Sequence, residues 1–167
     1  EACAALLLAR VSTTGAGGYT WNYADDGYPV GSRRPEDVSH ALVTTQLMRY
    51  AAEQSWWSPD DMTKVARTFT HQMWNGHPAR LNGRVDGSGA GVTEWVYTRA
   101  AVVGYATHGD APGGDPAVFD YARSILMSSY LTPFDRPLMT ASVGAPQLLA
   151  LGRMFEHRPD AFDPDSE

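Results

Sequence analysis

The sequence is poor in residues that form disulfides, thiolate metal sites or nucleic-acid-binding surfaces. Its single cysteine, Cys3, excludes an internal disulfide, and we expect this side chain to be a small buried apolar group. Only 13 Lys and Arg stand against 19 Asp and Glu, which gives a formal net charge of -6. Because binding to nucleic acid requires clustered positive charge, we expect no nucleic-acid partner.

Metal-ligating and cofactor-binding patterns are also missing. The five histidines are scattered along the chain without the spacing that a helix would need to bring two ligands together, so no metal site is predicted. The glycine-rich run GSGAG at 87–91 lacks the Lys-Ser/Thr ending of a phosphate loop and the strand–glycine–helix context of a dinucleotide site. We therefore expect no cofactor.

Long hydrophobic runs are absent as well. The opening run ACAALLLA covers only residues 2–9, whereas a membrane-spanning helix needs about 20 apolar residues. It has neither an initiator methionine nor the basic flank of a secretion leader. We expect no membrane partner, and we interpret this run as the last turns of a helix that begins at or before the first residue of this chain.

What the sequence does contain is typical of a globular domain. Hydrophobic residues make up 43% of the chain and aromatic residues 11%, and a length of 167 residues fits one domain on the usual scale of about 100 to 200. We expect a single domain over 1–167 with a flexible tail at 161–167. The absent initiator suggests a piece excised from a larger protein.

Apolar periodicity and capping residues predict a chain of helices with one long loop near the N-terminus. The second predicted helix starts with Pro35 and carries Val43, Leu47 and Ala51 beside its main apolar stripe, so we expect it to be buried on more than one side. The next, opened by Ser58, is an ordinary amphipathic helix. Such alternation is typical of a two-layer helical ring, and the alternative is a plain orthogonal bundle of helices. The helices are expected at about 2–11, 35–54, 58–75, 93–107, 115–129 and 146–156.

The stretch from 19 to 41, YTWNYADDGYPVGSRRPEDVSHA, holds most of the candidate chemistry. Tyr19, Trp21 and Tyr23 alternate and would share one face of an extended segment. Flat rings of this kind suit the C–H faces of sugars, and the alternative is that they fill the core beneath the loop. The tryptophans at 56, 57 and 74 are interpreted as packing residues.

Glu36 and His40 lie four residues apart in the second predicted helix, which would place them on one face, with Asp37 beside them. A carboxylate next to an imidazole can transfer protons. The alternative is structural: Glu36 and Asp37 would stabilise the positive end of the helix dipole, and His40 would be a buried histidine with satisfied hydrogen bonds.

Three motifs together resemble the helical toroid, or six-hairpin, superfamily of carbohydrate-active proteins, including polysaccharide lyases. The resemblance covers about residues 19–107. It implies an all-α fold of paired antiparallel helical hairpins. Because the sequence holds about three such hairpins, we expect a partial (α/α) toroid with one long N-terminal loop. From its own residues, the run 81–85 is a candidate short strand or hairpin arm. The resemblance also implies a secreted or periplasmic location. The motifs are Tyr19-x-Trp21-x-Tyr23, Pro35-Glu36-Asp37-x-Ser39-His40-Ala41, and Val85-Asp86-Gly87-Ser88 followed by Trp95.

The function implied by the resemblance is cleavage of an oligo- or polysaccharide, with a lyase on uronic-acid polymers favoured over a glycoside hydrolase. In a lyase, Tyr19 or Tyr23 would remove the proton beside the sugar carboxylate and His40 would assist. Asn22 or Arg34 would offset the charge of the substrate.

A hydrolase would use two carboxylates instead. Glu36 or Asp37 would pair with Asp86, and Trp21 would stack on the sugar in either case. An alternative from a different class is a non-catalytic glycan-binding or scaffold domain.

Overall fold

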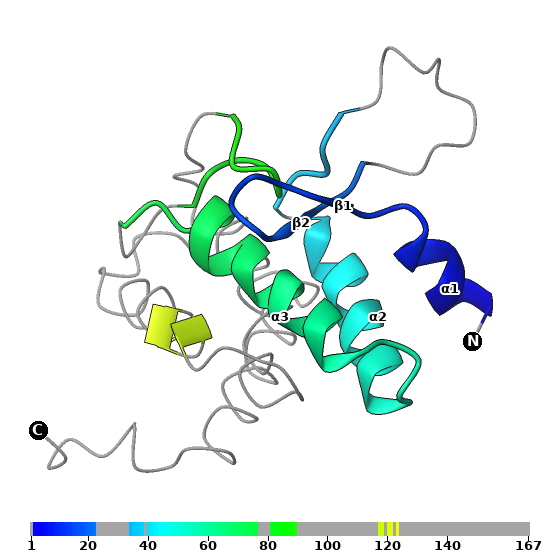
Figure 1. Cartoon of the computed structure of the whole chain (residues 1–167). Coiled ribbons are helices and arrows are strands. Elements are labelled where there is room, and N and C mark those ends of the chain that lie inside the picture. The colour runs from blue at the N-terminus through cyan, green and yellow to red at the C-terminus, as the bar shows by residue number, and fades with distance from the viewer. Residues whose placement is uncertain are drawn as a thin grey trace, which may run out of the picture.

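The computed structural model describes residues 2–22, 34–38, 40–76 and 81–89, together with positions 117, 118, 120, 121 and 123. Helix α2 lies between α1 and α3 and contacts both, while strand β2 packs against α3 (Figure 1). In chain order the elements are α1 (Ala2–Leu8), β1 (Ser12–Thr13), β2 (Tyr19–Thr20), α2 (Ala41–Glu53), α3 (Pro59–Arg67) and a π-helical segment η2 (Thr68–Met73).

The predicted all-α toroid is wrong, because part of the expected N-terminal loop is an antiparallel β-hairpin. Thr13 pairs with Tyr19, and Ser12 pairs with Thr20. The turn between them is closed by hydrogen bonds between Thr14 and Gly18, in which the amide N–H of Thr14 donates to the carbonyl of Gly18 at 2.8 Å. The described part of the chain is therefore a mixed fold of three α-helices and a two-stranded sheet.

Helix α2 begins at Ala41, six residues later than predicted, since the preceding segment is engaged in extended pairing. Pro35 pairs with Asn22, and Asp37 pairs with Arg84. Asp37 ends this extended segment by capping the turn before α2: its Oδ1 accepts the N–H of His40 at 3.1 Å, and its carbonyl accepts the N–H of Ala41 at 3.0 Å. Asp37 therefore caps the turn before α2 and does not lie in the first turn of the helix, where the prediction of a helix from Pro35 had placed it.

Helix α3 begins where the sequence predicts. Ser58 is its N-cap and forms a capping box with Asp61, and Pro59 occupies the first turn. The helix then widens into η2, where the N–H of Trp74 donates to the carbonyl of Phe69 five residues earlier at 2.8 Å. The predicted stop at 75–76 is close to the observed end at Met73.

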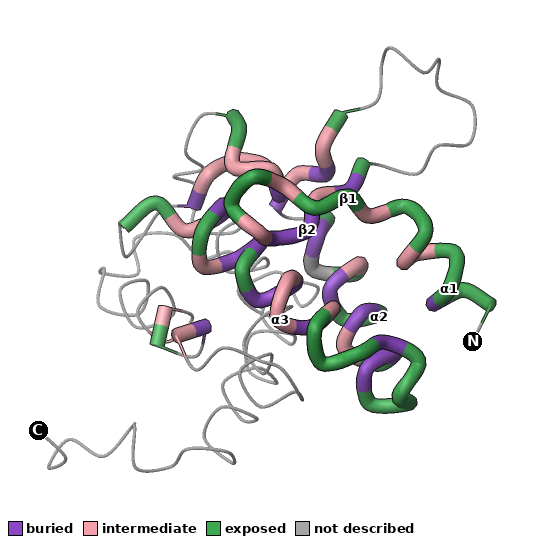
Figure 2. Tube along the Cα trace, in the orientation of Figure 1, coloured by how far each residue is buried: buried purple, intermediate pink, exposed green. Residues whose placement is uncertain are grey.

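The core lies between the facing sides of α2, α3, η2 and β2 (Figure 2). Contrary to prediction, α2 is buried on one side only, because Val43 and Leu47 are exposed while Ala51 is buried. Cys3 is exposed rather than buried. The largest fully buried side chains are Phe69, Met48, Met62, Met73, Leu81 and Val38.

Of the three tryptophans interpreted as packing residues, Trp57 and Trp74 attach other segments to this core, whereas Trp56 is exposed, contrary to the prediction. Trp57 is buried, and its indole N–H donates to the carbonyl of Ala4 in α1 at 3.1 Å. Trp74 stacks on Tyr121, with ring centroids 4.7 Å apart and an interplanar angle of 7°. The described positions around Tyr121 are helical, in agreement with the fifth predicted helix.

The helices predicted at 93–107 and 146–156 and the tail at 161–167 lie outside the described residues. The candidate hairpin at 81–85 is only partly confirmed, since Leu81 and Arg84 make isolated bridges to Trp74 and Asp37 rather than forming a strand. Within the described ranges, no helix has the length and apolar character that crossing a membrane would require.

Candidate functional site

The candidate site is built where three segments distant in sequence pair side by side. The segment 34–38 lies between Trp21 on one side and the loop 81–89 on the other. The N–H of Glu36 donates to the carbonyl of Trp21 at 3.0 Å, and the N–H of Val85 donates to the carbonyl of Glu36 at 3.0 Å. We call the solvent-accessible part of this pairing the outer edge. It consists of the exposed residues Asn22, Arg34 and His40 and the partly buried residues Asp37, Arg84 and Asp86.

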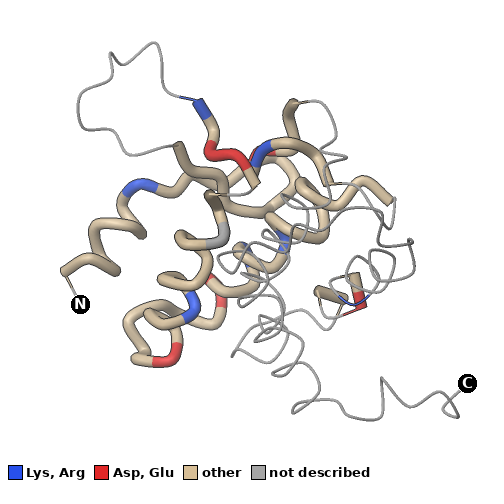
Figure 3. Tube along the Cα trace, turned by 180° about the vertical axis from the view of Figure 1, so that it is seen from behind, with Lys and Arg blue, Asp and Glu red and all other residues tan. Residues whose placement is uncertain are grey.

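Acidic and basic positions alternate along the outer edge (Figure 3). Arg34 is exposed, and no ion pair joins its guanidinium to any residue that the structure describes. Asn22 is also exposed and lies next to it through the Asn22–Pro35 bridge. A hydrogen-bonding amide and a positive charge are therefore neighbours at this edge.

The central feature of the outer edge is a contact between Asp37 and His40. The imidazole Nδ1 lies 2.8 Å from Oδ2 of Asp37, and the His40 side chain is 66% exposed. When the carboxylate is ionised, Nδ1–H donates to it, and the other ring nitrogen, Nε2, is then the proton acceptor. This geometry can hold an imidazole in the orientation and tautomer required of a general base.

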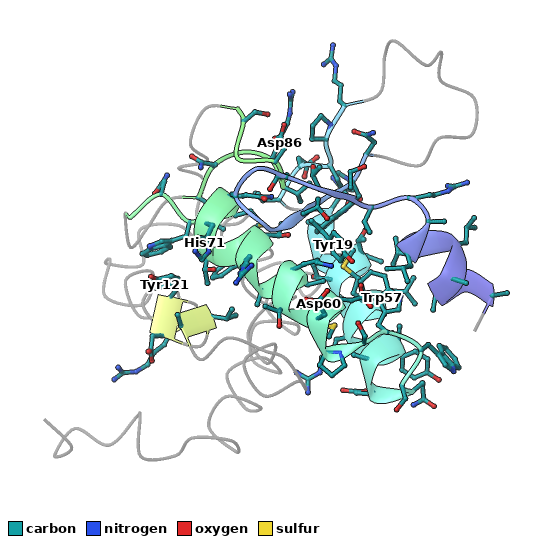
Figure 4. All side chains as sticks on the ribbon, in the orientation of Figure 1. Tyr19, Trp57, Asp60, His71, Asp86 and Tyr121 are labelled. Atoms are coloured by element: carbon teal, nitrogen blue, oxygen red, sulfur yellow. The ribbon has the colours of Figure 1, made fainter. Side chains whose placement is uncertain are left out.

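The predicted aromatic rim does not face this edge. Tyr19 and Trp21 lie on one side of the extended segment, as the alternation predicts, but both rings are buried in the core. The Tyr19 ring packs edge to face on Trp57 at a centroid distance of 6.1 Å and points inward in Figure 4. The packing alternative therefore holds for both residues, and Tyr23 lies outside the described residues.

Tyr19 is also chemically unsuited to remove a proton. Its hydroxyl donates to Oδ1 of Asp61 at 2.5 Å. Burial raises the pKa of the Tyr19 phenol well above its ordinary value, and the hydrogen bond to Asp61 with the negative charges of Asp61 and Asp60 raises it further. The phenol consequently keeps its proton at neutral pH, which removes Tyr19 as a candidate base.

Glu36 and His40 do not share a helix face, because both precede the first residue of α2. The Glu36 carboxylate is buried and accepts hydrogen bonds from the indole N–H of Trp21 and, at 2.8 Å, from the hydroxyl of Thr44. Glu36 thus connects β2 to α2 and is turned away from the outer edge. It is poorly placed to act on a substrate.

Asp86, the predicted second carboxylate of a hydrolase, lies on the loop 81–89, which contributes to the outer edge (Figure 4). Its Oδ1 accepts the N–H of Ser88 at 2.9 Å, which fixes the turn of this loop. Asp86 follows Arg84, the bridge partner of Asp37, by two residues. The carboxylates of Asp37 and Asp86 therefore belong to adjoining segments, whereas Glu36 faces the other way.

The Tyr19–Asp61 contact predicts a pH-dependent stability. Burial by itself would raise the pKa of Asp61, but hydrogen bonds from Ser58 and Tyr19 and the charge of Lys64 outweigh it and hold the pKa below its usual range. Since the folded-state pKa is below the unfolded value of about 4, the stabilisation is complete above that pH and is lost as the pH falls through the folded-state pKa.

We expect Tyr19→Phe to lower the free energy of unfolding by about 1 kcal/mol at pH 7, a modest value because Asp61 is only partly buried. The deficit should shrink as the pH falls from about 4 through the folded-state pKa of Asp61, because the protonated carboxyl no longer attracts the phenol as a charged acceptor. Urea unfolding of both proteins between pH 7 and pH 3 measures this. In the background of Asp61→Asn the deficit should not change with pH, and a constant deficit with Asp61 present would contradict the assignment.

One polar residue that sequence reasoning missed lies at the centre of these contacts. Gln72 in η2 is buried, and its side-chain amide donates to the carbonyls of Tyr19 at 3.0 Å and Val85 at 2.5 Å. Its Oε1 accepts the hydroxyl of Thr14. The only sequence signal was a glutamine next to apolar residues at the end of the third predicted helix, and in an amphipathic helix a glutamine is expected on the solvent side.

The described residues contain no group of three or more His, Cys, Asp and Glu side chains placed to hold a metal ion. In comparisons with family models, with curated proteins and with solved structures, no match to this chain was found.

Proposed function

We propose that the chain acts on an oligo- or polysaccharide of uronic acids and cleaves it by β-elimination, with His40 as the base. The observation that carries the proposal is the 2.8 Å contact between Nδ1 of His40 and Oδ2 of Asp37, made by a His40 side chain that is 66% exposed. The resemblance of the flanking motifs to polysaccharide lyases supports the choice of substrate class. Elimination is favoured over hydrolysis because Glu36 is buried and hydrogen-bonded to Trp21 and Thr44, and because Asp37, the other carboxylate that could pair with Asp86, is engaged with His40.

The proton removed in such an elimination is the one on the carbon that bears the carboxylate. Nε2 of His40 takes this proton, the C–H electron pair forms a carbon–carbon double bond, and the glycosidic C–O bond on the next carbon breaks. The departing oxygen is then protonated by the imidazolium or by water. Arg34 and Asn22 would bind the substrate carboxylate, whose negative charge grows as the proton leaves.

The test is the ultraviolet absorbance of the unsaturated product during incubation of the full chain with uronic-acid polymers. General base catalysis contributes on the order of 100-fold or more, so His40→Ala should slow product formation by at least that factor. His71→Ala is the matched control, because His71 is also exposed but lies on η2, where its Nδ1 contacts the hydroxyl of Thr70 at 2.7 Å. The lyase proposal fails if no uronic polymer gives the unsaturated product, or if both variants are equally slow.

Asp37 has two roles that one substitution can separate. It caps the turn before α2, and it orients His40. Asp37→Ser retains a good capping oxygen but is too short and uncharged to hold the imidazole. We expect a nearly unchanged free energy of unfolding with slower elimination, and full activity in Asp37→Ser would remove the orienting role.

The burial of Tyr19 and Trp21 favours a second candidate function, a non-catalytic glycan-binding or scaffold domain, because neither ring is available as a catalytic rim. In that case uronic polymers would bind without being cleaved. Binding without an increase in ultraviolet absorbance would distinguish this function from the first.

A further inference from the structure

Two aromatic side chains are exposed together at the C-terminal end of α2, far from the outer edge. Tyr50 is 50% exposed and Trp56 is 39% exposed. Their rings meet edge to face, with centroids 5.8 Å apart and an interplanar angle of 80°. Tyr50 follows His40 by ten residues of α2, which is about 15 Å along the helix.

The backbone holds Trp56 in place before any ligand binds. Ser55 adopts a left-handed conformation with φ of 59°, and the N–H groups of Ser55 and Trp56 donate to the carbonyls of Ala52 and Ala51, both at 2.9 Å. The next residue, Trp57, is anchored in the core. A ring fixed on both sides of its Cα and supported by Tyr50 loses little conformational entropy when a ligand stacks on it.

Polar side chains lie beside Tyr50 on the surface of α2. Gln46, Glu53 and Gln54 lie four residues before, three after and four after Tyr50, so they are its neighbours on the helix surface, and all three are exposed. Glu53 is held by Arg49, whose Nε lies 2.8 Å from Oε1 of Glu53. Amide and carboxylate groups around a flat ring are the groups that hydrogen-bond sugar hydroxyls while the ring packs on sugar C–H groups.

We propose that Trp56 and Tyr50, with Gln46, Glu53 and Gln54, form a binding site for a neutral pyranose ring of an oligo- or polysaccharide. A neutral sugar fits better than a uronic acid, because Glu53 is negative and its neighbour Arg49 is already paired with it. The site binds without cleaving and does not depend on the proposed elimination at His40. We call it the aromatic platform.

Two experiments on the full chain test the aromatic platform. The first is affinity electrophoresis in gels that contain soluble neutral glucan, xylan, mannan or galactan. We expect at least one of these polymers to retard the wild-type chain, and we expect Trp56→Ala and Tyr50→Ala each to weaken the retardation at least tenfold. Val43→Ala is the matched control, because Val43 is an exposed apolar residue on α2 that is not part of the platform, and it should leave retardation unchanged.

The second experiment observes the indole N–H signals of the five tryptophans by NMR during titration with an oligosaccharide of the retarding polymer. The signal assigned to Trp56 through Trp56→Phe should shift, whereas that of Trp57, whose N–H is bound to the carbonyl of Ala4, should not. This measurement uses the wild-type fold and remains decisive if Trp56→Ala is unstable.

His40→Ala should bind neutral sugars as the wild type does. Failure of the proposed lyase activity and failure of sugar binding at the aromatic platform can therefore be distinguished. The platform is overturned if no neutral polymer retards the chain, if the Trp56 signal does not shift, or if Trp56→Ala changes the sedimentation coefficient of the chain without changing retardation. The last result would identify this surface as a protein contact.

Discussion

Replacing Gln72 by leucine is expected to lower the free energy of unfolding by about 3 kcal/mol. The side chain is buried, and its amide donates to the carbonyls of Tyr19 and Val85 while its oxygen accepts the hydroxyl of Thr14. Leucine has a similar volume but forms no hydrogen bond with the two carbonyls or with the hydroxyl of Thr14. A buried polar group that loses its hydrogen bond costs about 1 to 3 kcal/mol. Tyr19 retains the hydroxyl of Thr68 as a donor at 2.7 Å, so the cost is less than the sum over all three groups.

Gln72→Glu tests the same contacts through the pH dependence of the free energy of unfolding. A carboxylate at this position would face two carbonyl oxygens and could not donate to either, so its pKa should be raised in the folded state. The variant should therefore be less stable at pH 7 than at pH 5, because the folded state gains stability as the carboxyl becomes protonated.

Gln46→Leu on the exposed side of α2 is the control and should change the free energy of unfolding by less than about 0.5 kcal/mol. Chemical unfolding measured by circular dichroism covers all three variants, and a Gln72→Leu protein as stable as the wild type would contradict the role of this residue.

Local signals in the sequence were sufficient for α3 and insufficient for α2. The Ser58 cap, Pro59 and the capping box all lie within four residues, and the structure confirms them. Pro35, Glu36 and Asp37 carry the same kind of signal, but the segment pairs with Trp21 and Val85 instead. Long-range pairing overrode the local preference, and no local pattern shows that a partner strand is available.

The alternation of aromatic residues correctly predicted that the rings share one side of the extended segment, but it did not predict whether that side faces the core or the solvent. Period-two spacing places Tyr19 and Trp21 on the same side, which the structure confirms. Which side faces the core is decided by residues far away, such as Asp61, which is 42 positions from its hydrogen-bond partner Tyr19. The candidate site depends in the same way on contacts that are distant in sequence, because long-range pairing of the segment 34–38 determines where α2 begins. The contact between Asp37 and His40 spans three residues and was predictable once the helix start was known.

Exchanging Gly18 for alanine is the second change with a large expected effect, a loss of about 3 kcal/mol in the free energy of unfolding. Gly18 sits where the β-hairpin crosses the junction of α3 and η2. A Cβ atom there would lie 2.7 Å from the amide nitrogen of Thr68, 2.9 Å from the carbonyl carbon of Arg67 and 2.7 Å from Oε1 of Gln72. Two of these three atoms belong to the helix backbone and cannot rotate away, so the hairpin itself must move. Overpacking of this kind costs about 1 to 3 kcal/mol, and the displacement also weakens the Gln72 hydrogen bonds.

Gly15→Ala in the same hairpin is the matched control. No atom lies within 4 Å of a Cβ built at Gly15, and its φ is not positive. Alanine there restricts the unfolded chain without a clash, so we expect a free energy of unfolding unchanged or raised by up to about 1 kcal/mol. The difference in unfolding free energy between Gly18→Ala and Gly15→Ala therefore reports the close packing of the hairpin on α3, because any general effect of replacing glycine is common to both variants. If both variants lose stability equally, the hairpin does not pack on α3 as closely as the distances at Gly18 require. The outer edge is attached to the core through Trp21 and Val85. A hairpin displaced by Gly18→Ala would therefore also change the orientation of His40.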